Sequence, residues 1–330
     1  MRTRIFLPPV LRPTGGTAVL LQIARVLGEA GRDVRLVPRE ECGWIPDNVR
    51  RAAPVLAWDE MALGEGDLWL VPEGWVNALA PGLTSGARCV CYVQNWAYLF
   101  SALPEGVTWH QLAVEFLAVS DPVARFIRQT TGREPLVLRP GIDRERFLPP
   151  AKKPGGPVRV AYMPRKNKAL ARQVMDIFAS RNPASEPVFL PVEGQDADGV
   201  ARLLREAHVF LATGYPEGCP LPPLEALACG CLCVGFAGFG GWDYMRQAQA
   251  APRTRPWIDL REVPWEGNGF WCADADVLDA ALCLEEAMAL LRQDGAPLHN
   301  ILANARATAD AYSEEEQRRA ILAVWDALGG

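Results

Sequence analysis

The sequence has 330 residues, of which 49% are hydrophobic and 22% charged, and its formal net charge is −5 at neutral pH. A chain of this length favours two domains of about 150 residues each. The apolar content excludes a disordered chain, because such chains bury too little apolar surface to fold. The acidic balance lacks the basic surplus that is typical of nucleic-acid-binding proteins, so we expect no nucleic-acid partner.

The nine cysteines are an odd number, and several lie inside apolar runs, which is typical of reduced, buried thiols. Disulfides are rare in the cytoplasm, so we expect a cytoplasmic protein. Cys229, Cys231 and Cys233 alternate without a second cluster at zinc-type spacing, so we expect no metal and no cofactor. No apolar run approaches the roughly 20 residues that span a bilayer. We expect a soluble protein, at most peripheral at the inner membrane face.

Short apolar runs separated by helical patterns recur through the first 150 residues. A glycine-containing turn at 12–16 precedes apolar residues at helical spacing, and Gly31 is placed to end that helix. Continuous apolar strands separated by helices indicate a parallel sheet that is buried on both faces. The predicted strands of this part cover residues 5–10, 34–38, 67–73, 88–95, 116–120 and 135–141.

Residues 149–157 bring together prolines, glycines and two lysines, a composition typical of a linker. The same alternation restarts after it, so we expect an α/β protein with two Rossmann-like, doubly wound domains, 1–150 and 151–312. Ligands bind such sheets beyond the carboxyl ends of the strands, and two facing sheets would make the cleft between them the binding site. The predicted strands of the second part are 158–164, 187–194, 208–214 and 231–236, and its predicted helices are 199–207, 276–292 and 314–328.

The segment 212–236 carries the strongest chemical signal, because it holds two glutamates eight residues apart. Glu217 lies in a loop rich in glycine and proline, and Glu225 lies in the first turn of a predicted helix. The two carboxylates can therefore face one ligand from two directions. The amino end of that helix offers backbone N–H groups and a partial positive charge, which suit a diphosphate.

The glutamate pair, the preceding strand and the following EALACG resemble the donor-site signature of retaining glycosyltransferases with the GT-B fold, the family 4-like "glycosyl transferases group 1". The likeness extends to RPTGG at 12–16, LAVSDPVARFI at 117–127 and RPGIDRERF at 139–147. It implies a metal-independent hexosyl- or deoxyhexosyl-type transferase that uses a nucleotide-sugar donor. A saccharide or lipid-linked acceptor is implied by the branch it resembles most, the bacterial surface-polysaccharide enzymes. The last helix, 313–330, would pack back on the N-terminal domain.

The resemblance also implies roles for individual residues. Glu217 would contact hydroxyls of the donor sugar, and Glu225 would bind the ribose of the nucleotide. Arg165 and Lys168 would neutralise the diphosphate, where a fixed cationic clamp stabilises the charge on the leaving oxygen. The paired glycines after the first strand would bring backbone N–H groups close to the donor. The remaining implied contacts are Gly15, Gly16, Gly218, Cys219 and Leu221 toward the donor, and Gln94 and Asn95 on the acceptor or sugar side.

The sequence departs from the family at two positions. Pro220 stands where members often have glycine, and a proline cannot donate a backbone hydrogen bond to the sugar. Gln94 or Asn95 stands where many members have a histidine facing the sugar. Neither side chain can act as a general base, so we assign both to binding only.

Structural interpretations compete with each assignment. Glu225 would also complement the dipole of its own helix, and Arg165 and Lys168 would also suit a solvated turn. The aspartate pairs at 196–198 and 274–276 favour helix capping over metal binding. The apolar stretch 96–103 favours a buried loop over contact with a membrane or lipid. Two other functions stay open: an inert nucleotide- or sugar-binding partner, which Pro220 favours, and a nucleotide-sugar epimerase, which would need acid and base residues that the sequence lacks.

Overall fold

The computed structural model describes residues 1–11 and 13–329. Arg12, the first residue of the predicted glycine turn, and Gly330 lie outside the described residues. The chain forms two compact units. Unit 1 comprises Met1–Gly141 and Glu315–Gly330, and unit 2 comprises Ile142–Glu314. The sequence placed these boundaries at 150 and 313.

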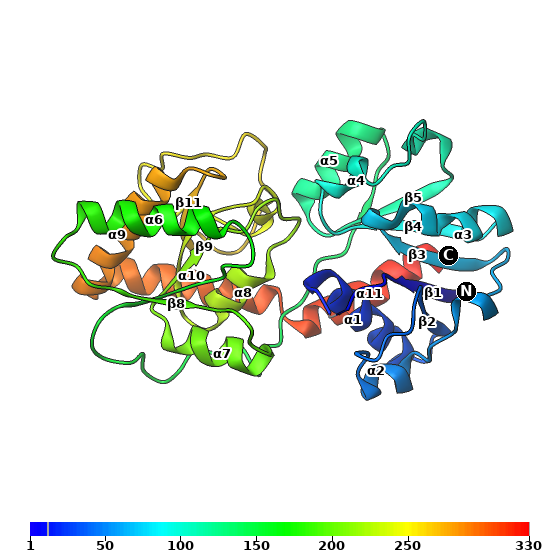
Figure 1. Ribbon diagram of the computed structural model, residues 1–330, viewed down its shortest axis with the longest axis horizontal. Helices are drawn as coiled ribbons and strands as arrows, with labels where there is room; N and C mark the ends of the chain where they lie inside the picture. Colours follow the sequence, from blue (N-terminus) through cyan, green and yellow to red (C-terminus); the bar gives the residue numbers. More distant parts are fainter. Residues whose placement is uncertain (12, 330) are drawn as a thin grey trace. The chain divides into compact units, whose positions relative to one another are not determined.

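Unit 1 is built on a six-stranded parallel sheet in the order β2-β1-β3-β4-β5-β6. Ile5 of β1 lies opposite Leu36 of β2 and Leu70 of β3, and all three are completely buried. Ile5, Phe6 and Leu7 of β1 point alternately to the two faces of the sheet and are all buried, so helices must cover both faces. The strands are β1 (Arg2–Leu7), β2 (Val34–Pro38), β3 (Asp67–Pro72), β4 (Arg88–Val93), β5 (Val114–Ala118) and β6 (Leu136–Val137), and the helices of the N-terminal part are α1 (Gly15–Glu29), α2 (Asp47–Ala52), α3 (Ala80–Ser85), α4 (Tyr98–Ser101) and α5 (Asp121–Thr131) (Figure 1).

The last helix, α11 (Glu314–Gly329), belongs almost entirely to unit 1. The indole N–H of Trp325, a buried side chain, donates to the hydroxyl of Thr3 on β1 over 3.0 Å. Arg318 pairs with Glu29 of α1, and this pair adds an exposed contact between the two ends of the chain. Figure 1 shows this helix in red beside the blue N-terminal elements. The C-terminal residues therefore complete the core that the N-terminal residues begin.

Unit 2 is built on a five-stranded parallel sheet in the order β11-β10-β9-β7-β8. On one face α6 and α9 lie side by side and bury Val174, Phe178 and Leu284 against the strands. Among the other helices, α8 packs against both α7 and α10 (Figure 1). The strands are β7 (Arg159–Tyr162), β8 (Val188–Pro191), β9 (Val209–Ala212), β10 (Leu232–Phe236) and β11 (Gly269–Cys272), and the helices are α6 (Lys168–Arg181), α7 (Ala197–Glu206), α8 (Leu221–Ala228), α9 (Val277–Gln293) and α10 (Ala296–Ala311).

The two parallel sheets confirm the predicted fold class of two Rossmann-like domains. Some boundaries differ from the prediction. The first strand covers Arg2–Leu7 rather than 5–10, because the prolines that follow it cannot donate to a sheet ladder. The run at 135–141 contributes only two residues to the sheet. β11 and α10 are additional elements that the sequence interpretation did not include.

Among the described residues, no helix is long and apolar enough to cross a membrane. All nine cysteines lie among the described residues, and each is buried and outside a disulfide, as the position of several of them in apolar runs predicted.

Candidate active site

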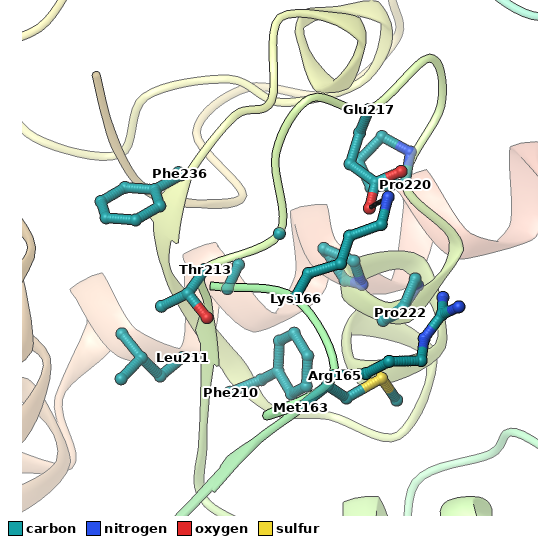
Figure 2. A pocket seen from close by; sticks show the side chains of 13 residues that line it. Met163, Arg165, Lys166, Phe210, Leu211, Thr213, Glu217, Pro220, Pro222 and Phe236 are labelled. Carbon is teal, nitrogen blue, oxygen red and sulfur yellow. Dashed lines mark hydrogen bonds and ion pairs between the residues drawn. The ribbon is translucent and has the colours of Figure 1, made fainter. Parts of the chain in front are cut away.

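A pocket opens at the carboxyl edge of the unit 2 sheet, where parallel strands of this fold class bind ligands. Figure 2 shows its side chains, which come from four segments, one of which is the end of β10 with Phe236. The segment after β7 contributes Arg165 and Lys166, the loop after β9 contributes Thr213 and Glu217, and the start of α8 contributes Pro222. The sequence prediction brings Glu217 and Arg165 to the same place, and the structure has both lining this pocket.

Lys166 and Glu217 form the central polar contact of the pocket. The Lys166 ammonium donates to Glu217 Oε1 over 2.7 Å, and the two side chains are 31% and 21% exposed. Both point into the same space in Figure 2. A carboxylate and an ammonium at the mouth of a pocket can each exchange this contact for a ligand group. The site thus presents an acceptor for sugar hydroxyls and a cation for phosphate oxygens at adjacent positions.

Asn167 holds Lys166 in this position. Its side-chain amide donates to the carbonyls of Thr213 and Tyr215 over 2.9 and 3.0 Å, so it joins the β7 loop to the β9 loop. Its backbone is left-handed, with φ 57° and ψ 39°, a conformation that asparagine tolerates better than most residues. Asn167 is also the residue that precedes α6. The left-handed turn and the amide bridge together orient the chain just before the helix.

The two basic residues that the sequence singled out lie differently. Arg165 lines the pocket and is exposed, and in Figure 2 its guanidinium lies on the side of Pro222, apart from the contact of Lys166 with Glu217. Lys168 is the exposed first residue of α6 and is not among the residues that line the pocket. Sequence reasoning missed Lys166. The signal that could have found it is its place in the same basic turn, Arg-Lys-Asn-Lys.

The amino end of α8 borders the pocket with fewer N–H donors than an ordinary helix offers. Pro220 precedes the helix, and prolines also occupy its second and third positions, 222 and 223. Because proline has no N–H, the first turn retains only the donors of Leu221 and Leu224. The helix dipole remains, so the end still favours an anion. The backbone N–H groups that the sequence predicts here are therefore limited to those of Leu221 and Leu224.

Glu225 lies one turn into α8 and is partly exposed. Burial raises the pKa of its carboxyl to about 7, and the positive charge of Arg146 opposes this shift. Within the described part of the chain no donor hydrogen-bonds this carboxylate. It does not line the pocket that holds Glu217. A partly exposed carboxyl with unused acceptor atoms is suited to bind a pair of ligand hydroxyls.

The loops that follow β9 and β10 are tied together beside Glu217. The Glu217 N–H donates to the Gly238 carbonyl, and the Gly240 N–H donates to the Glu217 carbonyl, each over 3.0 Å. A side chain on Gly240 would place Cβ 2.0 Å from the Gly218 carbonyl oxygen, so the two loops touch backbone to backbone. The buried Tyr244 hydroxyl donates to the Pro220 carbonyl over 2.8 Å. Gly218, Cys219 and Leu221 thus lie in this braced loop or at its end, outside the pocket lining.

The aspartates at 274 and 276 have separate roles. Asp276 accepts from the Asp279 N–H and caps α9, and Asp196 caps α7 in the same way, as the capping interpretation predicted. Asp274 does not cap a helix: its carboxylate accepts from the Gly238 N–H over 2.8 Å. Burial raises the pKa of Asp274, and the nearby charge of Glu217 adds to that shift. This aspartate therefore fixes the β10 loop beside the pocket.

At the corresponding edge of unit 1, Gln94 joins the loop after β4 to the first turn of α1. Its side-chain amide donates to the Gly16 carbonyl over 2.9 Å, and a Cβ at Gly16 would come within 2.6 Å of Gln94 Oε1. Gly15 and Gly16 are the first residues of α1, which Thr14 caps. The buried Asn95 accepts from the Ala97 N–H. The side chains of Gln94 and Asn95 therefore both hydrogen-bond to neighbouring backbone at the edge of the sheet.

Glu73 is a buried carboxyl at this edge that the sequence analysis did not single out. It follows β3, is 4% exposed, and accepts from the backbone N–H groups of Gln94 and Asn95 over 3.0 and 2.8 Å. Burial raises its pKa to about 7, and the two backbone hydrogen bonds oppose that shift. Its signal in the sequence is a charged residue directly after a fully apolar strand. The carboxyl orders the loop that carries Gln94 and Asn95.

A buried group of possible metal ligands lies apart from the pocket. Cys272, Asp279 and Cys283 bring their ligand atoms within 4.8 Å of one another. The Arg253 guanidinium already donates to Asp279 and, over 3.4 Å, to Cys283 Sγ. The hydrogen bond between the two cysteines and their burial raise the pKa of the Cys272 thiol, which disfavours the thiolate that metals bind. Arg253 therefore supplies the positive charge that Asp279 requires.

No protein-family model matches this chain, but a known protein is similar to it in sequence. An alpha-1,6-glucosyltransferase of Actinobacillus pleuropneumoniae serotype 7 (strain AP76) is 26% identical over 237 residues, which cover 70% of this chain and 71% of that protein. The likeness thus extends beyond the glutamate segment into both units.

Solved structures are similar over nearly the whole chain. The sucrose-phosphate synthase of Thermosynechococcus elongatus has a TM-score of 0.67 at 15% identity and covers 99% of both chains. The catalytic domain of starch synthase IV from Arabidopsis thaliana, bound to ADP and acarbose, has a TM-score of 0.60 at 13% identity and covers 97% of this chain and 99% of that one. At these identities the likeness shows the fold, which is the GT-B fold that the sequence predicted.

Proposed function

We propose that this chain, a glycosyltransferase of the GT-B fold that uses a nucleotide-sugar donor, transfers a hexose with retention of the anomeric configuration. The observation that carries the proposal is the contact between Lys166 and Glu217 in the pocket at the carboxyl edge of unit 2. It places a carboxylate for sugar hydroxyls beside a cation for phosphate oxygens. The similar alpha-1,6-glucosyltransferase supports glucose as the transferred sugar.

In this proposal Glu217 binds hydroxyls of the donor sugar and Lys166 turns its ammonium to the diphosphate. Arg165, at the exposed side of the same pocket, adds a guanidinium that can hold two phosphate oxygens at once. As the bond to the sugar breaks, negative charge grows on the leaving phosphate oxygen, and the fixed cations stabilise it. Such a clamp supplies the charge that a divalent metal would otherwise bring. Lys168, two residues after Lys166, stays a predicted ligand of the same diphosphate.

Glu225 is the proposed ligand of the nucleotide ribose. Its partly exposed carboxyl has unused acceptor atoms, and a ribose has two neighbouring hydroxyl donors. Hydrogen bonds from those hydroxyls favour the charged carboxylate, so nucleotide binding should lower the pKa of Glu225. Gly218, Cys219 and Leu221, in the braced loop next to it, are proposed to line the donor as the family resemblance implies. The structural relative with bound ADP supports a nucleotide in a fold of this kind.

The acceptor side of the proposal rests on unit 1. Gly15, Gly16, Gln94 and Asn95 lie at the carboxyl edge of its sheet, where they would meet the sugar or the acceptor. A cleft between the two units and a saccharide or lipid-linked acceptor remain predictions from the family resemblance. The half-exposed Tyr98 and Phe100 of α4 would serve a peripheral membrane contact in the cytoplasm.

Thermal unfolding with UDP, GDP, dTDP and ADP in the presence of a metal chelator tests the proposal. One nucleotide should raise the Tm of the wild type, and the gain should shrink in Glu225→Ala, because a ligand stabilises only the state that binds it. Glu193→Ala removes an exposed glutamate of the same unit and is the matched control. If no nucleotide stabilises a folded wild type, the proposal fails and the inert-partner interpretation takes its place.

Turnover separates an enzyme from an inert partner. With the stabilising nucleotide identified, its hexose conjugates are incubated with the wild type and Glu217→Gln, and released nucleoside diphosphate is measured. An enzyme releases it slowly to water even without an acceptor, and Glu217→Gln should slow that release. Binding without any release in the wild type would favour the inert partner, for which Pro220 is the structural argument.

A further inference from the structure

Two aromatic rings are stacked on the surface of unit 2 beside the pocket. The rings of Phe239 and Trp257 are 6.1 Å apart at their centres and 19° from parallel. Trp257 is 72% exposed, on the irregular segment between β10 and β11. Burying an indole contributes a few kcal/mol to folding, so an exposed one gains little for stability. Tryptophan is enriched at interfaces, where a partner covers its exposed face.

The backbone under Phe239 is strained. Phe239 has φ 63° and ψ −59°, and the Gly240 N–H donates to the Gly238 carbonyl over 2.8 Å across it. This is a classical γ-turn, a rare and strained conformation, and its central residue carries a large side chain. Glycine would adopt it without that strain. The surrounding contacts keep the turn in place, since Asp274 accepts from the Gly238 N–H. Strain that is held in this way is concentrated at functional sites.

The strained turn is attached directly to Glu217. Glu217 and Phe239 form a parallel bridge, with hydrogen bonds from the Glu217 N–H to Gly238 and from the Gly240 N–H to the Glu217 carbonyl. Phe239 and Trp257 do not line the pocket in which Glu217 meets Lys166. The ring pair therefore lies next to the proposed sugar end of the donor, outside the donor's own pocket. The ribose carboxyl, Glu225, lies on α8 instead.

We propose that Phe239 and Trp257 form an aromatic platform that binds a hexose ring of the acceptor saccharide. The proposal rests on the proposed function, because it takes Glu217 as the residue that holds the donor sugar. One face of a hexose ring carries mainly C–H groups, and an aromatic face matches it through dispersion and through its negative quadrupole. A ring seated on the platform would lie beside Glu217, where the acceptor hydroxyl must meet the donor sugar.

The test measures saccharide and nucleotide binding in the same samples of full-length protein. Saturation-transfer NMR records binding of maltotetraose and of lactose with the stabilising nucleotide present, and thermal unfolding records the nucleotide. We expect Trp257→Ala to weaken saccharide binding at least fivefold and Trp257→Phe to retain most of it. Leu278→Ala, which removes a 52% exposed apolar side chain from the same unit, is the control.

A second variant distinguishes a loss of saccharide binding from a loss of folding. Phe239→Gly relaxes the turn and removes one ring, so we expect an unchanged or higher Tm together with weakened saccharide binding. The platform is overturned if the wild type, Trp257→Ala and Phe239→Gly bind saccharide equally well. It is also overturned if the wild type binds neither saccharide while the nucleotide still raises its Tm. If Trp257→Ala loses only the rise in Tm that the nucleotide causes and still binds saccharide, the rings bind the nucleotide base instead of the acceptor. Absence of any nucleotide shift in the wild type would overturn the proposed function itself.

Discussion

The ammonium of Lys166 lies 2.7 Å from the carboxylate of Glu217, so the two charges that we assign to the donor neutralise each other in the unliganded pocket. Neither side chain is deeply buried, and an exposed pair of this kind contributes little to stability. In the ion pair each side chain compensates the charge of the other until a substrate replaces the contact. A sugar hydroxyl and a phosphate oxygen together would make that exchange.

Replacing Lys166 by methionine should lower kcat about 10²- to 10³-fold, since it removes a cation that stabilises the developing phosphate charge. Methionine keeps the length of the side chain, so the pocket should retain its shape. Lys168→Met is the informative comparison, because the sequence favoured Lys168 and the structure has Lys166 lining the pocket. Steady-state kinetics on both variants decides: a larger loss in Lys168→Met would reverse our assignment.

Glu217→Gln should reduce kcat/KM about 10- to 100-fold, the range expected when a hydrogen bond to a charged acceptor becomes a neutral one. The nucleotide shift of Tm should persist, because this residue is assigned to the sugar and not to the nucleotide. Thermal unfolding with and without nucleotide, measured beside the kinetics, checks this. A variant that turns over normally would remove Glu217 from the donor site.

The raised pKa of Glu225 makes stability depend on pH. Its folded pKa is about 7 and the value in an unfolded chain is about 4.3, so between these values the folded state holds the extra proton. The wild type therefore loses stability as pH rises through this window. Glu225→Gln cannot lose that proton, so it should unfold at a higher Tm than the wild type at pH 8.5 and at a similar Tm at pH 5.

The control for this pH experiment is Glu193→Gln, which changes an exposed glutamate of the same unit. Its Tm should follow the wild type at both pH values. An equal difference between wild type and Glu225→Gln at pH 5 and pH 8.5 would show that the carboxyl of Glu225 titrates normally.

Glu73→Ala should loosen the loop after β4. It leaves the buried N–H groups of Gln94 and Asn95 without their acceptor, at a cost of about 1–3 kcal/mol for each group. Hydrogen exchange of residues 94–97 should speed up more than that of β4 itself. Glu65→Ala, an exposed glutamate of the same unit, should leave both segments unchanged. Exchange that rises equally throughout unit 1 would instead mean a general loss of stability.

Asn167 allows its backbone and side-chain roles to be separated. Asn167→Gly keeps the left-handed backbone and loses the amide bridge to Thr213 and Tyr215, whereas Asn167→Ala loses both. If the bridge positions Lys166, both variants should lower kcat, with alanine the more severe and also the less stable. Normal kcat in Asn167→Gly would show that the turn alone orients the lysine.

The strands could be predicted from the sequence because their residues are apolar on both faces, as in VFLA of β9 and LCVGF of β10. The strand at 135–141 was predicted too long, since an apolar run does not say how many of its residues find a partner strand. α10 was missed because Pro297 and several small residues weaken its pattern, although proline suits the first turn of a helix.

The candidate site could be predicted as a segment but not as a set of side-chain contacts. Spacing identified Glu217, and the family resemblance implied the basic turn after β7, yet neither could say which cation of that turn faces Glu217. That choice depends on the left-handed backbone at Asn167, which no periodic pattern encodes. Glu73 and the pair of Phe239 with Trp257 were missed for a similar reason. Each acts through residues that are distant in the sequence.

The return of α11 to unit 1 has a consequence for dissecting the protein. Unit 2 is one uninterrupted stretch of chain, so a single gene fragment encodes all of it. Unit 1 is encoded in two pieces, and a fragment that stops before Glu315 lacks Trp325, the partner of Thr3. A functional unit 1 would therefore have to be made by joining its last helix to the end of its sheet through a new linker, or by supplying that helix as a separate peptide.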